Sequence, residues 1–275
     1  MKTNDVFISG GLGDCLLHTP LIETLFNLFN KRINVFTNQV NHFELLQNNP
    51  YCDINLELDI NKFISNKKNR FISYGNLLPS ISSNESASSL ICRLYGIKPF
   101  TNNPQIFLYP EEINFGQSFT ENLVRPISFN PSSQCSKNQE WSIESWHLLI
   151  KSLPHVSFLQ LGVASESLIE GAIDCRGKYS LREQLAILAH SSLYVGLDSF
   201  WGHACSALGI KGIILFGDSS PTIWGHSNNI NIYKSYSCSP CIDWLYGDKC
   251  PYSNKCMLDI ALNEVLFEIN SYLNI

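Results

Sequence analysis

The sequence predicts an α/β protein with two domains, each built on a parallel sheet. Short apolar segments alternate with amphipathic segments in both halves of the 275-residue chain. That alternation is typical of strands joined by crossover helices. A polar segment at 110–125 ends in Arg125-Pro126 and separates the two series. We therefore expect an N-terminal domain at 1–125 and a C-terminal domain at 126–275.

The N-terminal half begins with a short apolar strand that runs into a glycine-rich turn. Apolar residues then recur at helical spacing from Cys15, and Pro20 is tolerated because it falls in the first turn. The Asn49-Pro50 pair breaks the chain, and Gly96 is suited to end a helix. The pattern predicts strands at 5–9, 32–37, 53–58, 70–74 and 105–109, and helices at 15–31, 41–47 and 86–95.

The C-terminal half restarts the alternation after Pro126. Ser142 is suited to begin a helix, because its hydroxyl can cap the first turn. Gly162 and Gly209 are placed to end the elements before them. The pattern predicts strands at 127–130, 156–161, 172–174, 193–196 and 212–216, and helices at 141–153, 166–171, 180–191, 200–208 and 258–273.

Composition excludes several classes of protein. The formal net charge of −5 argues against a general nucleic-acid binder, which is usually basic. No run of about 18 apolar residues marks a transmembrane helix, and the N-terminus lacks the apolar core of a signal peptide. We therefore expect a cytoplasmic protein with at most peripheral membrane contact. In that compartment its ten cysteines would be reduced thiols or metal ligands.

The glycine-rich turn after the first strand carries one acid, Asp14. Gly10, Gly11 and Gly13 let the backbone turn sharply and approach another molecule, because they have no Cβ. Asp14 then lies near a helix N-terminus at the carboxyl end of a strand, where open α/β sheets place ligands. An ordinary helix-capping role would satisfy the same position. Both interpretations remain open on this stretch alone.

Polar loops also follow three strands of the second half. The first offers Ser132, Ser133 and Lys137, which are donors that a diphosphate needs, although a solvated loop would look the same. The second holds an acid, a hydroxyl and a histidine before or within the first turn of a helix, where unpaired backbone amides attract anions. These residues are Asp198, Ser199 and His203. An ordinary helix-capping role is the alternative interpretation. The third loop, 216–222, is rich in Gly, Ser and Pro.

Four cysteines have the sharpest spacing in the chain. Cys238, Cys241, Cys250 and Cys256 form a C-x2-C-x8-C-x5-C pattern in one loop, 238–256. Four thiolates suit a closed tetrahedral site for structural zinc, or for iron. Four reduced thiols without metal are the alternative.

These motifs together resemble glycosyltransferase family 9, the ADP-heptose:lipopolysaccharide heptosyltransferases. The resemblance spans nearly the whole chain, with its motifs in order. In this sequence, Lys137 is separated from Trp141 by three residues, which is longer than the usual family pattern. The matching segments are 10–20, 48–53, Ser132-Ser133 with Lys137 and Trp141, 198–204, 215–221 and the cysteine-rich tail.

The resemblance implies a GT-B architecture, in which two Rossmann-like domains face a central cleft and the final helix returns to the first domain. It implies inverting transfer of a sugar, most simply heptose from ADP-heptose, to a hydroxyl of a lipopolysaccharide-core or other glycan or lipid-linked acceptor. Asp14 would be the general base, and no catalytic metal is needed. The donor would be bound by Gly13, Ser132, Ser133, Lys137, Glu166 (ribose hydroxyls), Asp198 (sugar hydroxyls), Ser199 and His203 (phosphates).

Two alternatives remain open. One is a transferase that uses another nucleotide sugar or a protein acceptor, as do the heptosyltransferases that modify autotransporters and carry a four-cysteine iron site. The other is a non-catalytic subunit that binds a nucleotide sugar. For a lipid-linked acceptor, the peripheral contact expected of this cytoplasmic protein would be at the inner membrane face.

Overall fold

The computed structural model describes residues 5–65, 70–71, 84–241 and 250–275. The chain divides into two compact units, Met1–Tyr109 and Pro110–Ile275. The division falls before the polar segment that we expected to end the first domain at 125. That segment forms α6 (Pro110–Thr120), which packs against α8 (Leu181–Ala189) of the second unit.

Two contacts join α6 to the rest of the second unit. Gly116 lies so close to α8 that an added Cβ would sit 2.1 Å from the carbonyl oxygen of Ala186. One turn earlier, the Glu112 carboxylate pairs with the buried Arg182 guanidinium at 2.5 Å. A buried ion pair and a close helix crossing are long-range contacts, so the polar sequence alone did not reveal them.

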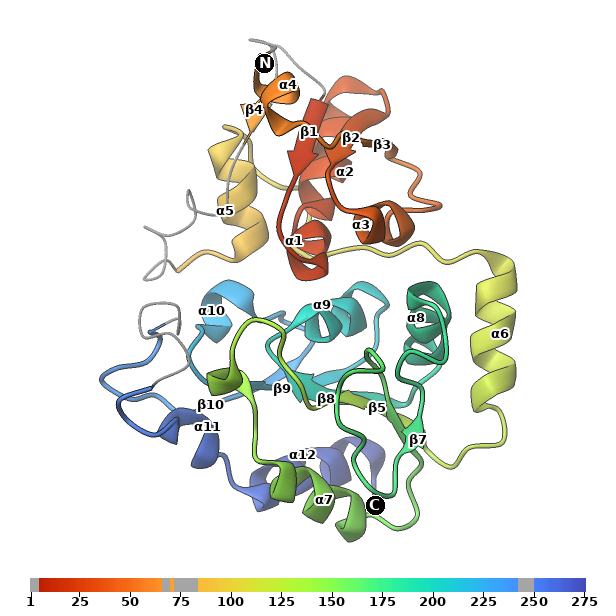
Figure 1. Cartoon of the computed structure of the whole chain (residues 1–275), viewed down its shortest axis with the longest axis vertical. Helices are drawn as coiled ribbons and strands as arrows, with labels where there is room; N and C mark the ends of the chain where they lie inside the picture. Colours follow the sequence, from red (N-terminus) through yellow and green to blue (C-terminus); the bar gives the residue numbers. More distant parts are fainter. Residues whose placement is uncertain (1–4, 66–69, 72–83, 242–249) are drawn as a thin grey trace. The chain divides into compact units, whose positions relative to one another are not determined.

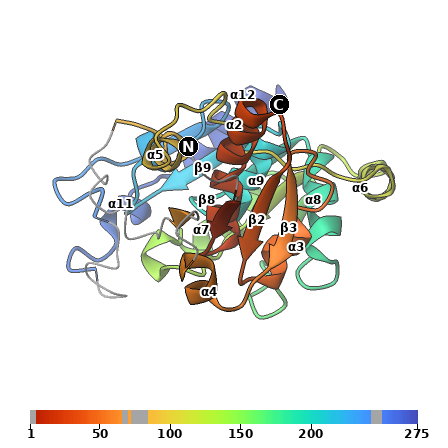
Figure 2. The same cartoon turned by 90° about the horizontal axis from the view of Figure 1, so that it is seen from above.

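The first unit contains a four-stranded parallel sheet in the order β3-β2-β1-β4. Figure 2 shows β2 and β3 side by side. Helices α2 and α5 pack against each other, as do α1 and α3. The elements are β1 (Asp5–Ile8), α1 (Leu12–Leu17), α2 (Thr19–Phe29), β2 (Ile33–Thr37), α3 (Val40–Leu45), β3 (Cys52–Leu56), α4 (Ile60–Ser65), β4 (Arg70–Phe71) and α5 (Ala87–Leu94).

The structure corrects two expectations in this unit. The helix expected at 15–31 is two helices, because the chain turns at His18 and Pro20 lacks the N–H needed to continue α1. The strand expected at 105–109 is irregular, and the Gln105 amide donates instead to the Thr19 hydroxyl at 2.9 Å. Of the strand expected at 70–74, residues 72–74 lie outside the described residues.

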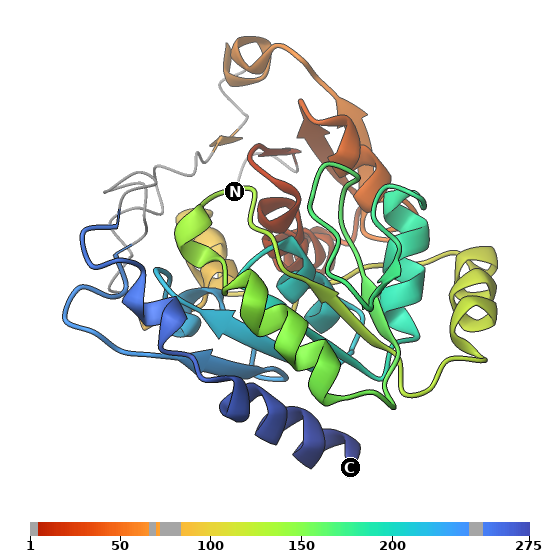
Figure 3. The same ribbon diagram turned by 60° about the horizontal axis from the view of Figure 1, so that its bottom comes forward.

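The second unit contains a six-stranded parallel sheet in the order β10-β9-β8-β5-β6-β7. Helices α8 and α9 lie on one face of this sheet, and α7 and α12 lie on the other (Figures 1 and 3). The remaining elements are β5 (Ile127–Asn130), the 3-10 helix η3 (Lys137–Gln139), α7 (Ile143–Ser152), β6 (Phe158–Gln160), β7 (Ile173–Asp174), β8 (Leu193–Leu197), α9 (Phe200–Ala207), β9 (Gly212–Phe216), α10 (Pro221–Trp224), β10 (Ile230–Tyr233), α11 (Lys255–Leu258) and α12 (Leu262–Leu273).

The core of the second unit explains where the final helix packs. Trp146 of α7 stacks on Phe129 of β5 with ring centroids 5.5 Å apart. Val265 and Ile269 of α12 are fully buried in the same apolar cluster. The apolar face of α12 is therefore buried within its own unit. The expectation that the final helix returns to the first domain stays a prediction.

One further expectation, a helix at 166–171, is also wrong. The segment is an irregular loop after β6. The buried Gln160 side chain donates to the Ser167 carbonyl and accepts from the Ile169 amide, both at 2.8 Å. These bonds take backbone groups that a helix would have used. Among the residues described, no helix combines the length and hydropathy required to cross a membrane.

Candidate functional site

The turn between β1 and α1 folds the Asp14 side chain back over its own glycines. Gly10 has a φ of +98°, and the Gly11 amide donates to Asp14 Oδ2 at 2.7 Å. A Cβ on Gly10 would lie 2.2 Å from that same oxygen. Asp14 therefore caps the first turn from inside α1, next to Gly13, and the glycine leaves room for its carboxylate.

His42 holds this turn from α3, although sequence reasoning did not single it out. Its Nε2 lies 3.0 Å from the Gly11 carbonyl oxygen, and its Nδ1 lies 2.8 Å from the Thr37 hydroxyl. Burial lowers the pKa of His42, which favours the neutral ring. Because a carbonyl only accepts, Nε2 carries the proton and the Thr37 hydroxyl donates to Nδ1. The sequence signal was a histidine shortly after the second strand.

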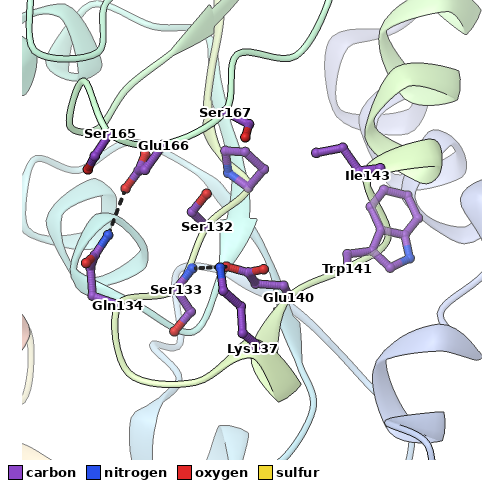
Figure 4. Close-up of a pocket in the computed structure, with 11 residues that line it drawn as sticks. Ser132, Ser133, Gln134, Lys137, Glu140, Trp141, Ile143, Ser165, Glu166 and Ser167 are labelled. Carbon is purple, nitrogen blue, oxygen red and sulfur yellow. Dashed lines mark hydrogen bonds and ion pairs between the residues drawn. The ribbon is translucent and has the colours of Figure 1, made fainter. Parts of the chain in front are cut away.

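A pocket of about 400 Å³ lies at the carboxyl end of β5 in the second unit (Figure 4). It brings together four of the predicted donor-binding residues, Ser132, Ser133, Lys137 and Glu166. Hydroxyls and a lysine suit phosphate oxygens, and a carboxylate suits ribose hydroxyls. The grouping follows from parallel strands, whose carboxyl ends meet at one edge of a sheet.

Glu166 reaches the pocket from the loop after β6. Its carboxylate accepts from Asn130 Nδ2 at 2.9 Å and from Gln134 Nε2 at 3.3 Å. Burial raises its pKa, although these hydrogen bonds oppose the shift. Gly162 has a φ of +134°, and a Cβ there would lie 2.0 Å from Glu166 Oε2. As with Gly10 and Asp14, a glycine two residues after the end of a strand makes room for an acid four residues later.

The hydrogen-bond donors of the pocket that suit a phosphate contact a carboxylate of the chain itself. Glu140 Oε1 accepts from the Ser133 amide and from Lys137 Nζ, each at 2.9 Å. The Ser133 hydroxyl donates to Gln139 Oε1 at 2.7 Å. Neither Gln139 nor Glu140 was predicted from the sequence, where both fell in an unassigned polar loop.

Asp198 lies at the end of β8 and does not line this pocket. The Ser219 hydroxyl donates to its Oδ2. Burial, and to a smaller extent the nearby Asp218, raises the pKa of Asp198 to about 7. Gln139 Nε2 donates to Asp218 Oδ1 at 3.1 Å. Gln139 therefore links the pocket serine to the 216–222 loop that borders Asp198.

His203 is buried in α9 and faces another histidine. Its Nδ1 lies 2.8 Å from His226 Nε2. Burial lowers the pKa of both rings, that of His226 to about 4, so both are neutral near pH 7. Ser199 occupies the N-cap position of α9 but makes no capping hydrogen bond with its side chain. His203 and Ser199 do not line the pocket.

The four cysteines of the 238–256 loop lie near one another. The pKa of Cys241 is about 12 and that of Cys256 about 11, raised by burial first and then by Asp218 and the neighbouring thiols. Within the described part of the chain, however, no three His, Cys, Asp or Glu side chains are arranged to hold a metal ion. Residues 242–249 of this loop lie outside the described residues.

Comparison with known proteins assigns part of the chain to a family. Residues 117–246 match the family described as Glycosyltransferase family 9 (heptosyltransferase). These residues form a glycosyltransferase family 9 domain. The match contains the whole pocket and confirms both the resemblance predicted from the sequence and the enzyme class, a glycosyltransferase that uses a nucleotide sugar. No curated protein sequence matches the chain significantly.

Solved structures share the fold of the whole chain. A glycosyltransferase family 9 protein from Veillonella parvula is 16% identical, with a TM-score of 0.73, and 98% of this chain and 96% of that one are covered. E. coli ADP-heptose LPS heptosyltransferase II is 16% identical, with a TM-score of 0.69 and coverage of 100% and 99%.

A third structure is the iron-containing dodecameric glycosyltransferase TibC from enterotoxigenic E. coli. It is 17% identical, with a TM-score of 0.75 and coverage of 98% and 78%. TibC has also been solved with ADP-D-beta-D-heptose. At these identities the likeness establishes the fold, and it confirms the predicted GT-B class with two Rossmann-like parallel-sheet units.

Proposed function

We propose that this family 9 protein transfers a heptose from ADP-heptose, with inversion, to a hydroxyl of a lipopolysaccharide-core or other surface-glycan acceptor. The observation that supports it most is the pocket in which two serines, Lys137 and Glu166 converge inside the family 9 domain. The ADP-heptose complex of TibC supports the choice of donor. The enzyme would act in the cytoplasm, at the inner membrane face where its acceptor is lipid-linked.

The proposed reaction is a single displacement. The acceptor oxygen attacks the anomeric carbon while the bond from that carbon to the diphosphate oxygen breaks, and ADP leaves. Asp14 takes the acceptor proton, which is the role of a general base. Lys137, Ser132 and Ser133 stabilise the charge that develops on the leaving diphosphate. These groups stabilise that charge without a catalytic metal.

The remaining residues have supporting roles in the proposal. Glu166 accepts hydrogen bonds from ribose hydroxyls, and Gly13 keeps the turn beside Asp14 free of side-chain bulk. Asp198 accepts from hydroxyls of the sugar, and Ser199 binds phosphate with the first amides of α9. His203 helps to hold the phosphates through the ring edge opposite its bond to His226.

A panel of nucleotide sugars tests the proposal. The intact protein is heated with ADP-heptose, ADP-glucose, UDP-glucose or GDP-mannose, because a ligand that binds the folded state raises the midpoint by mass action. We expect ADP-heptose to give the largest rise and to be consumed only with an acceptor. A larger rise with another nucleotide sugar would favour a different donor. Binding without transfer to any glycan or protein acceptor would favour a non-catalytic subunit.

Lys137 should contribute strongly to donor binding. Replacing it with Ala removes a charge-assisted hydrogen bond, which should weaken ADP and ADP-heptose binding by about ten- to a hundredfold. Calorimetric titration measures both affinities. The control is Lys151→Ala, because Lys151 is an exposed cation at the end of α7 and outside the pocket. Equal affinities in the two variants would remove Lys137 from the diphosphate site.

We also propose that the four cysteines hold one structural zinc or iron ion. The C-x2-C-x8-C-x5-C spacing supports it, as does the effect of the neighbouring thiols on the pKa of Cys241. The described side chains do not themselves form a closed metal site. Purified protein should contain about one ion per chain by elemental analysis. Cys238→Ser should lose the ion and unfold at a lower temperature, whereas Cys135→Ser, at an exposed cysteine elsewhere, should keep it. A metal content far below one ion per chain would contradict the proposal.

A further inference from the structure

Two hydrogen-bond donors of the pocket already bind a carboxylate of the chain itself, that of Glu140. The Ser133 amide and the Lys137 ammonium both donate to one atom, Glu140 Oε1, and each distance is 2.9 Å (Figure 4). A backbone N–H and a lysine ammonium that converge on one oxygen are the donors that bind a phosphate oxygen in many proteins. The Glu140 carboxylate therefore occupies the position that these donors would offer to a phosphate.

The local chain geometry brings Glu140 into this position. Ser136 caps the 3-10 helix η3 with its hydroxyl, and the Glu140 amide donates to the Lys137 carbonyl at 3.1 Å. This tight turn carries Glu140 back toward Lys137. Immediately afterwards, the Trp141 indole donates to the Ile260 carbonyl at 3.0 Å, which anchors the end of the turn in the core.

The exposure of the pair indicates that the contact can open. The Lys137 side chain is 72% exposed, whereas that of Glu140 is 22% exposed. An ion pair with one partner so exposed contributes little to stability, because water screens it and ordering the long side chain costs entropy. A diphosphate carries more charge than one carboxylate and presents several oxygens, so it can displace Glu140 from both donors.

We propose that Glu140 is an internal competitor of the donor diphosphate. In the empty protein its carboxylate binds the Ser133 amide and Lys137, and it leaves them when a diphosphate enters the pocket. The inference rests on the proposed function, because it assumes that the pocket takes the donor diphosphate. Competition of this kind weakens the binding of the donor and of the product ADP alike, and it keeps Lys137 neutralised while the pocket is empty.

The test measures affinity for ADP and for inorganic pyrophosphate by calorimetric titration of the full chain. In Glu140→Gln the side chain can still accept from the Ser133 amide, but the competing charge is gone. We expect both ligands to bind about three- to tenfold more tightly, since the lost competition is that of one partly exposed, charge-assisted contact. Glu140→Ala should bind at least as tightly. Glu144→Gln makes the same charge change at an exposed position in the first turn of α7 and should bind as the wild type does.

A second background separates competition from a general charge effect. In a Lys137→Ala background, adding Glu140→Gln should tighten the binding of ADP and pyrophosphate by a smaller factor. The reason is that one of the two donors for which Glu140 and the ligand compete is missing. Unchanged or weaker binding in Glu140→Gln overturns the inference, and weaker binding would identify Glu140 as a residue that positions Lys137. Wild-type protein that binds neither ADP nor pyrophosphate would instead overturn the proposed function itself.

Discussion

Replacing Asp14 with Asn should lower the rate of sugar transfer by about 10²- to 10⁴-fold, the usual contribution of a general base. The Asn carbonyl oxygen can still accept from the Gly11 amide, which donates to Asp14 at 2.7 Å. The turn should therefore keep its shape while losing the group that takes the proton. Initial rates at saturating ADP-heptose measure the effect, and ADP affinity should stay within about twofold because the diphosphate site lies on other residues.

Asp59→Asn is a matched control for this prediction. Asp59 is an exposed acid of the first unit, and its side chain accepts from backbone amides at the start of α4. Asn caps helices about as well as Asp does, so the control should fold and turn over normally. If Asp14→Asn kept a tenth or more of the wild-type rate, another group would have to take the proton.

Gly10→Ala should reduce transfer by about a hundredfold or more, although Gly10 itself has no functional group. The new Cβ would lie 2.2 Å from Asp14 Oδ2, so the carboxylate must move. A displacement of about 1 Å in a reacting group can cost a hundredfold in rate. The φ of +98° adds backbone strain of about 1–2 kcal/mol for a residue with a side chain.

Gly96→Ala isolates the effect of that strain. Gly96 lies in the same unit with a φ of +75°, but a Cβ there would meet nothing within 4 Å. Gly96→Ala should therefore lose thermal stability to backbone strain alone and keep its turnover, whereas Gly10→Ala should lose turnover as well. Equal losses of rate in the two variants would mean that stability alone, and not the placement of Asp14, governs the effect.

The candidate site was partly predictable because its signals are local. A glycine-rich turn after an apolar strand predicted the place of Asp14, and polar loops after strands predicted Ser132, Ser133 and Lys137. Parallel strands end at a common edge, so these residues were expected to gather, and the pocket brings Glu166 to them. Asp198, Ser199 and His203 do not line this pocket; Asp198 accepts from Ser219, and His203 contacts His226.

By itself, the sequence determined the alternation of strands and helices, the glycines at the turns and the family of the second unit. These features depend on periodicity and backbone freedom within a few residues. Only the tertiary structure decided that α6 belongs to the second unit, that α12 packs beside α7, that His42 holds the Asp14 turn, and that Glu140 occupies the phosphate donors. Each of these rests on side chains brought together by folding, and a local pattern does not specify which distant group a side chain will meet.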